Sequence, residues 1–278
     1  MITIQKSQLS VMNIQYRYFS LDKFLDDAVG NEVSNIELWG AMPFFNIEDM
    51  TYQEVKEVRH QIESRGLKLV CLTPEQCVYP VNLAAPSEAA RRRSLKFFED
   101  NIRAASELGT DKMLITTGYG FFDESNHEEA WKWARDGIYD LAELAKIHGI
   151  TLALEVLRRD ESNLVYNLPT LTQMLAELKH DSVGGMIDTI PMALAGERPA
   201  DYLQALGDRL VHVHFIDGAP RGHLAWGDGI LDMQGYLEEF SRYHYKGYLS
   251  LEITDGRYYM DPTQSVQQSV NALYKVLK

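Results

Sequence analysis

The chain has little cysteine and no long apolar run. Its two cysteines, Cys71 and Cys77, are spaced neither like a CxxC metal motif nor like the dense disulfide framework of a small secreted protein. No stretch of about 18 apolar residues occurs, and charged side chains are scattered through the N-terminal segment. We therefore expect a reduced, cytoplasmic protein with neither a signal peptide nor a membrane partner.

Positive charge is also scarce. The 27 lysines and arginines face 40 aspartates and glutamates, which gives a formal net charge of −13. The basic residues form no run longer than Arg91-Arg92-Arg93. Because such a chain repels a phosphate backbone, we expect no nucleic-acid partner.

Glycine-rich phosphate loops are missing as well. No GxGxxG follows the first apolar run, and GxxxxGK[ST] does not occur, which disfavours a dinucleotide-binding sheet and a P-loop. What is present is the composition of a packed globular protein, with 45% hydrophobic and 24% charged residues over 278 positions.

Eight short apolar runs alternate with eight amphipathic segments. We expect strands over residues 9–14, 35–38, 67–72, 112–116, 151–154, 183–187, 210–215 and 248–251. We expect helices over residues 21–29, 51–65, 87–108, 126–148, 169–178, 199–206, 233–243 and 262–277. Each unit spans roughly 35 residues, about one strand, one helix and two loops. The pattern predicts an α/β fold, a (β/α)8 TIM barrel formed by residues 1–278 as a single domain, with an open doubly wound sheet as the alternative.

The last four expected strands each end in a possible metal ligand, namely Glu155, Asp188, His214 and Glu252. The C-terminal ends of barrel strands converge on one rim, so these side chains should meet. Three crowded carboxylates repel one another, and a divalent cation would compensate their charge. Oxygen and imidazole ligands suit Mn, Co, Ni, Mg or Zn in an open site better than a thiolate-bound structural zinc. We expect one divalent metal ion per chain.

The seventh expected strand contains a second histidine, His212, beside His214. We expect one of the two to face the barrel interior and the other to face the helix layer. A single histidine in such a strand is more often a hydrogen-bonded structural residue than a ligand.

Motifs along the chain resemble those of the xylose-isomerase-like barrel family of sugar isomerases and epimerases. They are IELWG (36–40), LTPE (72–75), VYPVN (78–82), LALEV (152–156), MIDT (186–189), HVHFID (212–217), HLAWGDG (223–229) and SLEIT (250–254). Within the family, the 3-epimerases that act on fructoselysine are the most similar. That likeness rests on TPE followed by YPxN, on Glu-x5-Glu-Ser-Asn and on Tyr-Met-Asp-Pro at 259–262.

The resemblance implies roles for individual residues. Glu155, Asp188, His214 and Glu252 match the family's metal ligands, and Glu155 and Glu252 match its acid/base pair. One carboxylate would remove a proton from the third carbon of a ketose or ketosamine, and the other would return it from the opposite face through a cis-enediolate. Inversion needs two groups, because a single base returns the proton to the side it came from.

Six residues are expected near the substrate, which the resemblance implies is a small-molecule sugar or sugar amine. They are Glu161, His223, Glu75, Trp39, Tyr79 and Arg221. The chain departs from ketohexose 3-epimerases at two places, where Pro191 replaces a histidine and Pro220, next to Arg221, replaces an arginine. These departures favour a substituted sugar over a free ketohexose.

Other functions remain open at this stage. An aldose–ketose isomerase of the same architecture would share every residue above. The family also contains apurinic endonucleases, which need further histidine ligands and a basic surface, whereas the early strands here end in Gln15, Trp39 and Thr73. A non-catalytic sugar-binding barrel is the remaining alternative. For the assembly of the chain, the resemblance implies a homodimer or homotetramer.

Overall fold

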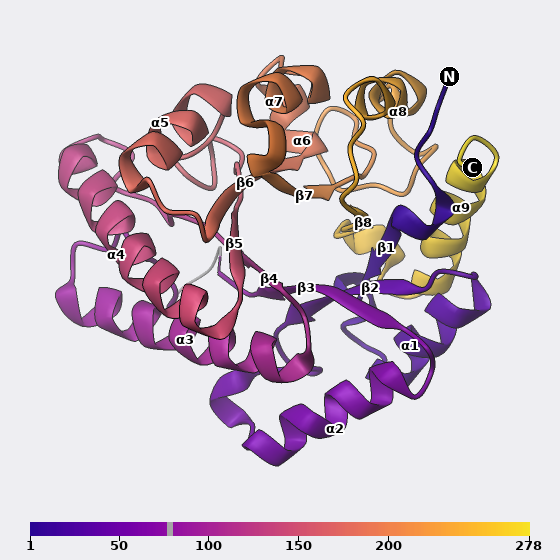
Figure 1. Ribbon diagram of the computed structural model, residues 1–278, viewed down its shortest axis with the longest axis horizontal. Helices are drawn as coiled ribbons and strands as arrows, with labels where there is room; N and C mark the ends of the chain where they lie inside the picture. The colour runs from indigo at the N-terminus through magenta and orange to yellow at the C-terminus, as the bar shows by residue number, and fades with distance from the viewer. Residues whose placement is uncertain (77–79) are drawn as a thin grey trace.

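The computed structural model describes residues 1–76 and 80–278, and at its centre lies a closed barrel of parallel strands (Figure 1). The strands are β1 (Leu9–Met12), β2 (Asn35–Gly40), β3 (Lys68–Pro74), β4 (Lys112–Ile115), β5 (Thr151–Leu154), β6 (Val183–Asp188), β7 (Leu210–His214) and β8 (Leu249–Leu251). Each strand pairs with the next in sequence, and β8 closes the ring by pairing with β1. The predicted (β/α)8 barrel is therefore confirmed.

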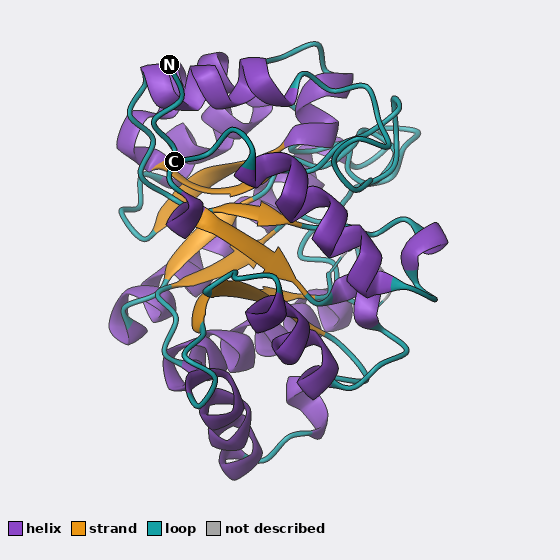
Figure 2. Ribbon diagram, turned by 90° about the vertical axis from the view of Figure 1, so that its right-hand side faces the viewer, coloured by secondary structure: helices purple, strands orange, loops and turns teal. Residues whose placement is uncertain are grey.

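Helices surround the strands on the outside (Figure 2). They are α1 (Leu21–Gly30), α2 (Tyr52–Glu63), α3 (Glu88–Leu108), α4 (His127–His148), α5 (Leu168–Leu178), α6 (Thr189–Leu194), α7 (Pro199–Leu206), α8 (Met233–Arg242) and α9 (Pro262–Tyr274). None of the helices in the described residues is long and apolar enough to cross a membrane. The sequence did not predict α6, because a six-residue helix is too short to show an apolar period.

Local signals explain where the long helices begin and end. The Ser87 side chain accepts a hydrogen bond from the backbone of Ala90 and caps the start of α3. Gly109 and Gly149 end α3 and α4 in the left-handed conformation, with φ of 82° and 70°. Each helix therefore stops where the chain must turn back toward the barrel, which sets the length of the unit.

The barrel interior has an apolar floor. Cys71, Leu114, Ala153 and Met186, from four successive strands, pack together apart from the larger core between strands and helices. The Sγ atom of Cys71 lies 3.9 Å from the hydroxyl of Thr73, which stands higher in the same strand. Polar groups gather above this floor, toward the C-terminal ends of the strands, as is usual in barrel enzymes.

The loop between β7 and α8 is organised around the buried carboxylate of Asp217. One carboxylate oxygen accepts hydrogen bonds from the backbone of Gly218 (2.8 Å) and Leu231 (3.0 Å). The other accepts from Gly227 (3.0 Å) and Gly229 (2.9 Å). This loop carries His223, so Asp217 fixes the backbone that positions one of the predicted substrate-binding residues.

Replacing Asp217 with asparagine is expected to lower the free energy of unfolding by about 3 kcal/mol. The amide nitrogen would face backbone N–H groups, and two of the four hydrogen bonds to a charged acceptor would be lost. Urea denaturation would measure the change, with Asp208→Asn on the exposed turn before β7 as the control. Equal midpoints for the two variants would contradict this role.

Candidate active site

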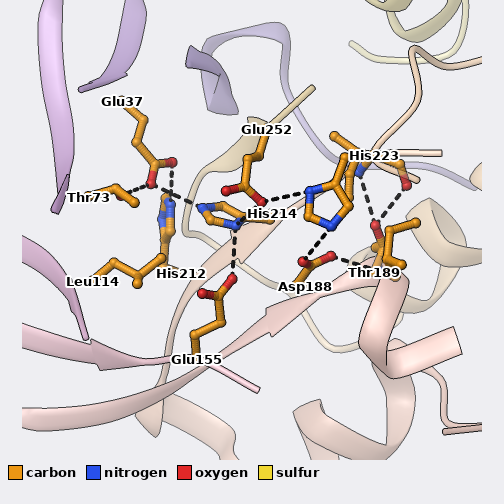
Figure 3. Close-up of polar contacts among 12 residues, drawn as sticks. Glu37, Thr73, Leu114, Glu155, Asp188, Thr189, His212, His214, His223 and Glu252 are labelled. Carbon is orange, nitrogen blue, oxygen red and sulfur yellow. Dashed lines mark hydrogen bonds and ion pairs between the residues drawn. The ribbon is translucent and has the colours of Figure 1, made fainter. Parts of the chain in front are cut away.

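The four predicted ligands meet at the C-terminal rim of the barrel. Asp188 and His214 are the last residues of β6 and β7, and Glu155 and Glu252 directly follow β5 and β8. One donor atom from each of the four lies within 4.8 Å of the others. Figure 3 shows the carboxylates of Glu155 and Glu252 on opposite sides of the His214 ring. The structure thus brings together residues that are as far apart in sequence as 155 and 252.

The geometry of this cluster fits a divalent cation. Nδ1 of His214 lies 3.2 Å from Oε1 of Glu155 and 3.0 Å from Oε2 of Glu252. Nevertheless, Nδ1 of His214 and Oε2 of Glu252 are buried without an aligned hydrogen-bond partner. Leaving buried polar atoms unpaired costs about 1–3 kcal/mol each. A cation bound between these two atoms would provide the partner that each of them lacks. Three carboxylates with one imidazole form a ligand set for a hard or intermediate ion.

Protons compensate the crowded charges in the metal-free protein. Burial raises the pKa of Glu155 to about 8 and also raises the pKa of Asp188. Burial opposes protonation of His223, but Asp188 and Glu252 outweigh it and raise the pKa of His223 to about 9. Burial alone would raise the pKa of Glu252, but His214 and His223 hold it at about 2. Without a metal, protons bound to the cluster therefore supply the positive charge that a cation would otherwise supply.

Beneath the four residues lies a carboxylate that the sequence analysis did not single out, Glu37 of β2. Its side chain is fully buried and accepts hydrogen bonds from Nε2 of His214 (3.0 Å), Nε2 of His212 (2.8 Å) and the hydroxyl of Thr73 (Figure 3). Burial would raise the pKa of Glu37, but the two histidines outweigh it and hold the pKa well below its usual value. The feature of the sequence that could have indicated Glu37 is an acid inside the otherwise apolar segment Ile36-Glu37-Leu38.

Glu37 sets the orientation of the His214 ring. An ionised carboxylate only accepts hydrogen bonds, so Nε2 of His214 must carry the proton that it donates. This leaves Nδ1 as the nitrogen that faces Glu155 and Glu252. A carboxylate that holds the far nitrogen of a histidine is the usual arrangement behind metal-binding histidines.

The expectation that His212 and His214 face opposite sides of β7 is wrong. Both rings are fully buried, and both donate to the same carboxylate of Glu37 inside the barrel. Side chains two residues apart in a strand point to the same face, so the two histidines must lie together.

A cavity of about 190 Å³ opens above the cluster. Of the residues predicted near the substrate, Trp39, Glu75, Glu161 and His223 line it. Arg221 is not among the residues lining this cavity; its side chain is 64% exposed and pairs with Asp160 at 2.9 Å. Tyr79 lies outside the described residues.

Two further contacts shape the wall of the cavity. The Glu161 carboxylate pairs with the guanidinium of Arg158 at 2.6 Å, and both side chains line the cavity. His223 lies beside the four predicted ligands and contacts two of them. Its Nε2 lies 3.3 Å from Oδ2 of Asp188, and its Nδ1 lies 3.1 Å from Oε2 of Glu252. Arg158 is not among the residues predicted near the substrate, although it stands three residues before Glu161.

The family model described as "Xylose isomerase-like TIM barrel" matches residues 26–276 of the chain. The chain belongs to this family. The match covers all the strands except β1, and it includes the four residues of the cluster as well as Glu37.

Its relatives and structural neighbours include several epimerases of sugars. Fructoselysine 3-epimerase of Shigella flexneri is 26% identical over 245 residues, which are 87% of this chain and 88% of that protein. The crystal structure of 3-keto-D-glucoside 4-epimerase from E. coli has a TM-score of 0.82 at 20% identity and covers 96% of this chain and 99% of its own. A D-psicose 3-epimerase structure has a TM-score of 0.80 at 18% identity, covering 96% and 97%. These similarities agree with the predicted isomerase acting on carbohydrates.

Proposed function

We propose that the chain is a divalent-metal-dependent epimerase that inverts the third carbon of a ketose or ketosamine, with a fructoselysine-like sugar amine as the preferred substrate. The observation that carries the proposal is the placement of Glu155 and Glu252 on opposite sides of His214 (Figure 3). Two carboxylates that reach one carbon from opposite faces are what inversion by proton transfer requires.

In this mechanism, Glu155, Asp188, His214 and Glu252 would hold the cation. The cation, when bound, polarises the substrate carbonyl and stabilises the negative charge that develops on the adjacent oxygens. Either Glu155 or Glu252 removes the proton from the third carbon, depending on which epimer is bound, and the other carboxylate delivers a proton to the opposite face. His223 holds the Glu252 carboxylate at 3.1 Å and thereby limits its movement.

The cavity wall supplies the remaining functions. Ile14, Leu157 and the ring of Trp39 form an apolar part of the wall that excludes water from the reacting carbon. Glu161 and Arg158, paired at 2.6 Å, offer polar groups for the sugar hydroxyls. Pro191 lies buried in α6, so this position offers no side-chain donor to a free ketohexose.

The position of the exchanged proton tests the reaction. Fructoselysine incubated with the protein in deuterated water should incorporate deuterium at the third carbon, as read by NMR. Deuterium at the first or second carbon alone would instead identify an aldose–ketose isomerase, which the same residues could support. Binding of a sugar amine without any exchange would indicate a non-catalytic sugar-binding barrel.

Removal of the metal is expected to abolish this exchange, and the affinity for Mn²⁺ is expected to rise with pH. Metal binding must displace protons from the cluster, including the one on Glu155, whose pKa in the metal-free protein is about 8. Calorimetric titration of chelator-treated protein at pH 6, 7 and 8 would measure the affinity and the released protons. Full exchange in a metal-free sample, or an affinity independent of pH, would contradict the expectation.

A further inference from the structure

Beside the cavity stands a guanidinium group, that of Arg17, for which the described part of the chain provides no anionic partner. Arg17 follows the 3-10 helix Ile14–Tyr16, directly after β1, on the face of the barrel where the cavity opens. The Arg17 side chain forms no ion pair with any residue in the described ranges 1–76 and 80–278, and its buried Nε has no hydrogen-bond partner there. The chain has 40 acids, yet none of those in the described residues pairs with this arginine, which stands beside the cavity without being one of its lining residues.

Two aromatic rings hold this guanidinium against the cavity wall. Its carbon lies 5.4 Å from the centre of the Trp39 ring and 4.5 Å from that of Tyr259. Trp39 lines the cavity itself, and the hydroxyl of Tyr259 donates a 2.8 Å hydrogen bond to the carbonyl of Thr254, which also lines it. Stacking occupies the faces of a guanidinium and leaves its in-plane N–H edge free, which is the geometry that binds carboxylates.

An unpaired acid stands at another side of the same tryptophan. The Glu75 carboxylate lines the cavity and accepts hydrogen bonds from Nε1 of Trp39 (3.1 Å) and from the backbone of Gln76 (3.1 Å). No lysine, arginine or histidine of the described chain forms an ion pair with Glu75. Trp39 is thus flanked by one cation and one anion, and a ligand that carries both signs of charge would pair them.

We propose that Arg17 and Glu75 bind an α-amino acid group carried by a sugar-amine substrate, with Arg17 taking the carboxylate and Glu75 the ammonium. This inference rests on the proposed function and specifies its substrate class. The charges of the wall favour a zwitterionic group over a phosphate group. The acids that line the cavity are Glu75, Glu155, Glu161, Asp188 and Glu252. Glu161 pairs with Arg158, and Glu155, Asp188 and Glu252 belong to the cluster whose charge protons or a cation compensate, so Glu75 is the acid of this wall that lacks a cation among the described residues. A zwitterion supplies that cation, whereas a phosphate dianion adds only negative charge.

The test compares two fructosyl-amines that differ only at the end of the tether with a sugar phosphate that has no tether. Nε-fructosyl-lysine carries the α-amino acid group, fructosyl-pentylamine has the same tether without it, and D-fructose 6-phosphate carries a different anion. Arg17→Met and Glu75→Gln should each raise KM for fructosyl-lysine by about 10- to 100-fold, with kcat little changed. KM for fructosyl-pentylamine should stay at the wild-type value in both variants.

Arg91→Met provides the matched control. Arg91, on α3, also stacks on a tryptophan, Trp133, at 4.2 Å, but Trp133 does not line the cavity, whereas Trp39 does. This variant should leave KM for all three ligands unchanged. An equal rise of KM for fructosyl-lysine and fructosyl-pentylamine would show that Arg17 only supports the wall, and no rise for either would also overturn the proposal.

Calorimetric binding of the same ligands separates this inference from the proposed function. If no ligand is turned over, but the wild-type protein binds fructosyl-lysine more tightly than fructosyl-pentylamine and Arg17→Met removes the difference, the epimerase proposal fails and the subsite stands. If D-fructose 6-phosphate is the ligand whose binding depends on Arg17, the group recognised is a phosphate and the amino acid subsite is overturned.

Discussion

Epimerisation is expected to fall by about 10²- to 10⁴-fold when either Glu155 or Glu252 is replaced with glutamine. Each carboxylate serves one face of the third carbon, and general acid–base catalysis by a positioned group typically contributes a rate factor of this order. The replacement keeps the size of the side chain and removes its ability to take a proton. Epimer interconversion would be followed by NMR with saturating Mn²⁺, and the metal content of each variant would be measured.

The two single variants should also differ from the double variant. With one carboxylate left, the proton of one epimer can still exchange with deuterated water without inversion, whereas the double variant should show no exchange from either epimer. Glu238→Gln on the exposed side of α8 is the matched control and should behave as wild type. Inversion that survives in the metal-loaded double variant would contradict the assignment of Glu155 and Glu252 as the acid/base pair.

Replacing Glu37 with glutamine is expected to weaken Mn²⁺ binding by about 10- to 100-fold, although Glu37 does not face the cation. The amide can no longer accept hydrogen bonds through both ends, so the ring of His214 loses the partner that fixes its orientation. Two buried histidines would also lose their anion, which should lower the free energy of unfolding by about 3–5 kcal/mol. Calorimetry and urea denaturation would measure the two effects.

Two comparisons make this prediction specific. Glu57→Gln, on the exposed side of α2, should change neither quantity. Glu37→Asp keeps the charge and should recover part of the metal affinity that Glu37→Gln loses. If Glu37 only stabilised the fold, every folded variant would bind Mn²⁺ as tightly as the wild type. Wild-type metal affinity in folded Glu37→Gln would show that Glu37 does not position His214.

The fold can be predicted from the sequence because each unit of a barrel is encoded locally. An apolar run of about four to six residues followed by an amphipathic segment with a cap predicts one strand and one helix, and the repetition of this pattern limits the architecture. Differences arose where the signal was weak. The first strand ends at Met12, because Ile14 begins a 3-10 helix, and α6 is too short to have a period.

The site was only partly accessible in the same way. The strand-end positions of Glu155, Asp188, His214 and Glu252 were readable, because parallel strands of a barrel must end at one rim. The side-by-side placement of His212 and His214 also follows from the strand period, because side chains two residues apart share a face. The expectation that the two rings face opposite sides conflicts with this period. The contacts of Trp39 with Arg17 and Glu75 could not be predicted, since nothing local in the sequence connects a residue of β2 with residues that follow β1 and β3.

By itself, the sequence determined the eight strand–helix units, the acidic character of the chain and the residues that end the last four strands. Only the tertiary structure decided which of the buried polar groups are partners. Glu37 lies 175 and 177 positions from the two histidines that it holds, and closure of the barrel alone brings β2 and β7 across from each other. The physical reason is that apolar periodicity encodes each element locally, whereas a hydrogen bond across the barrel depends on the closure of all eight strands.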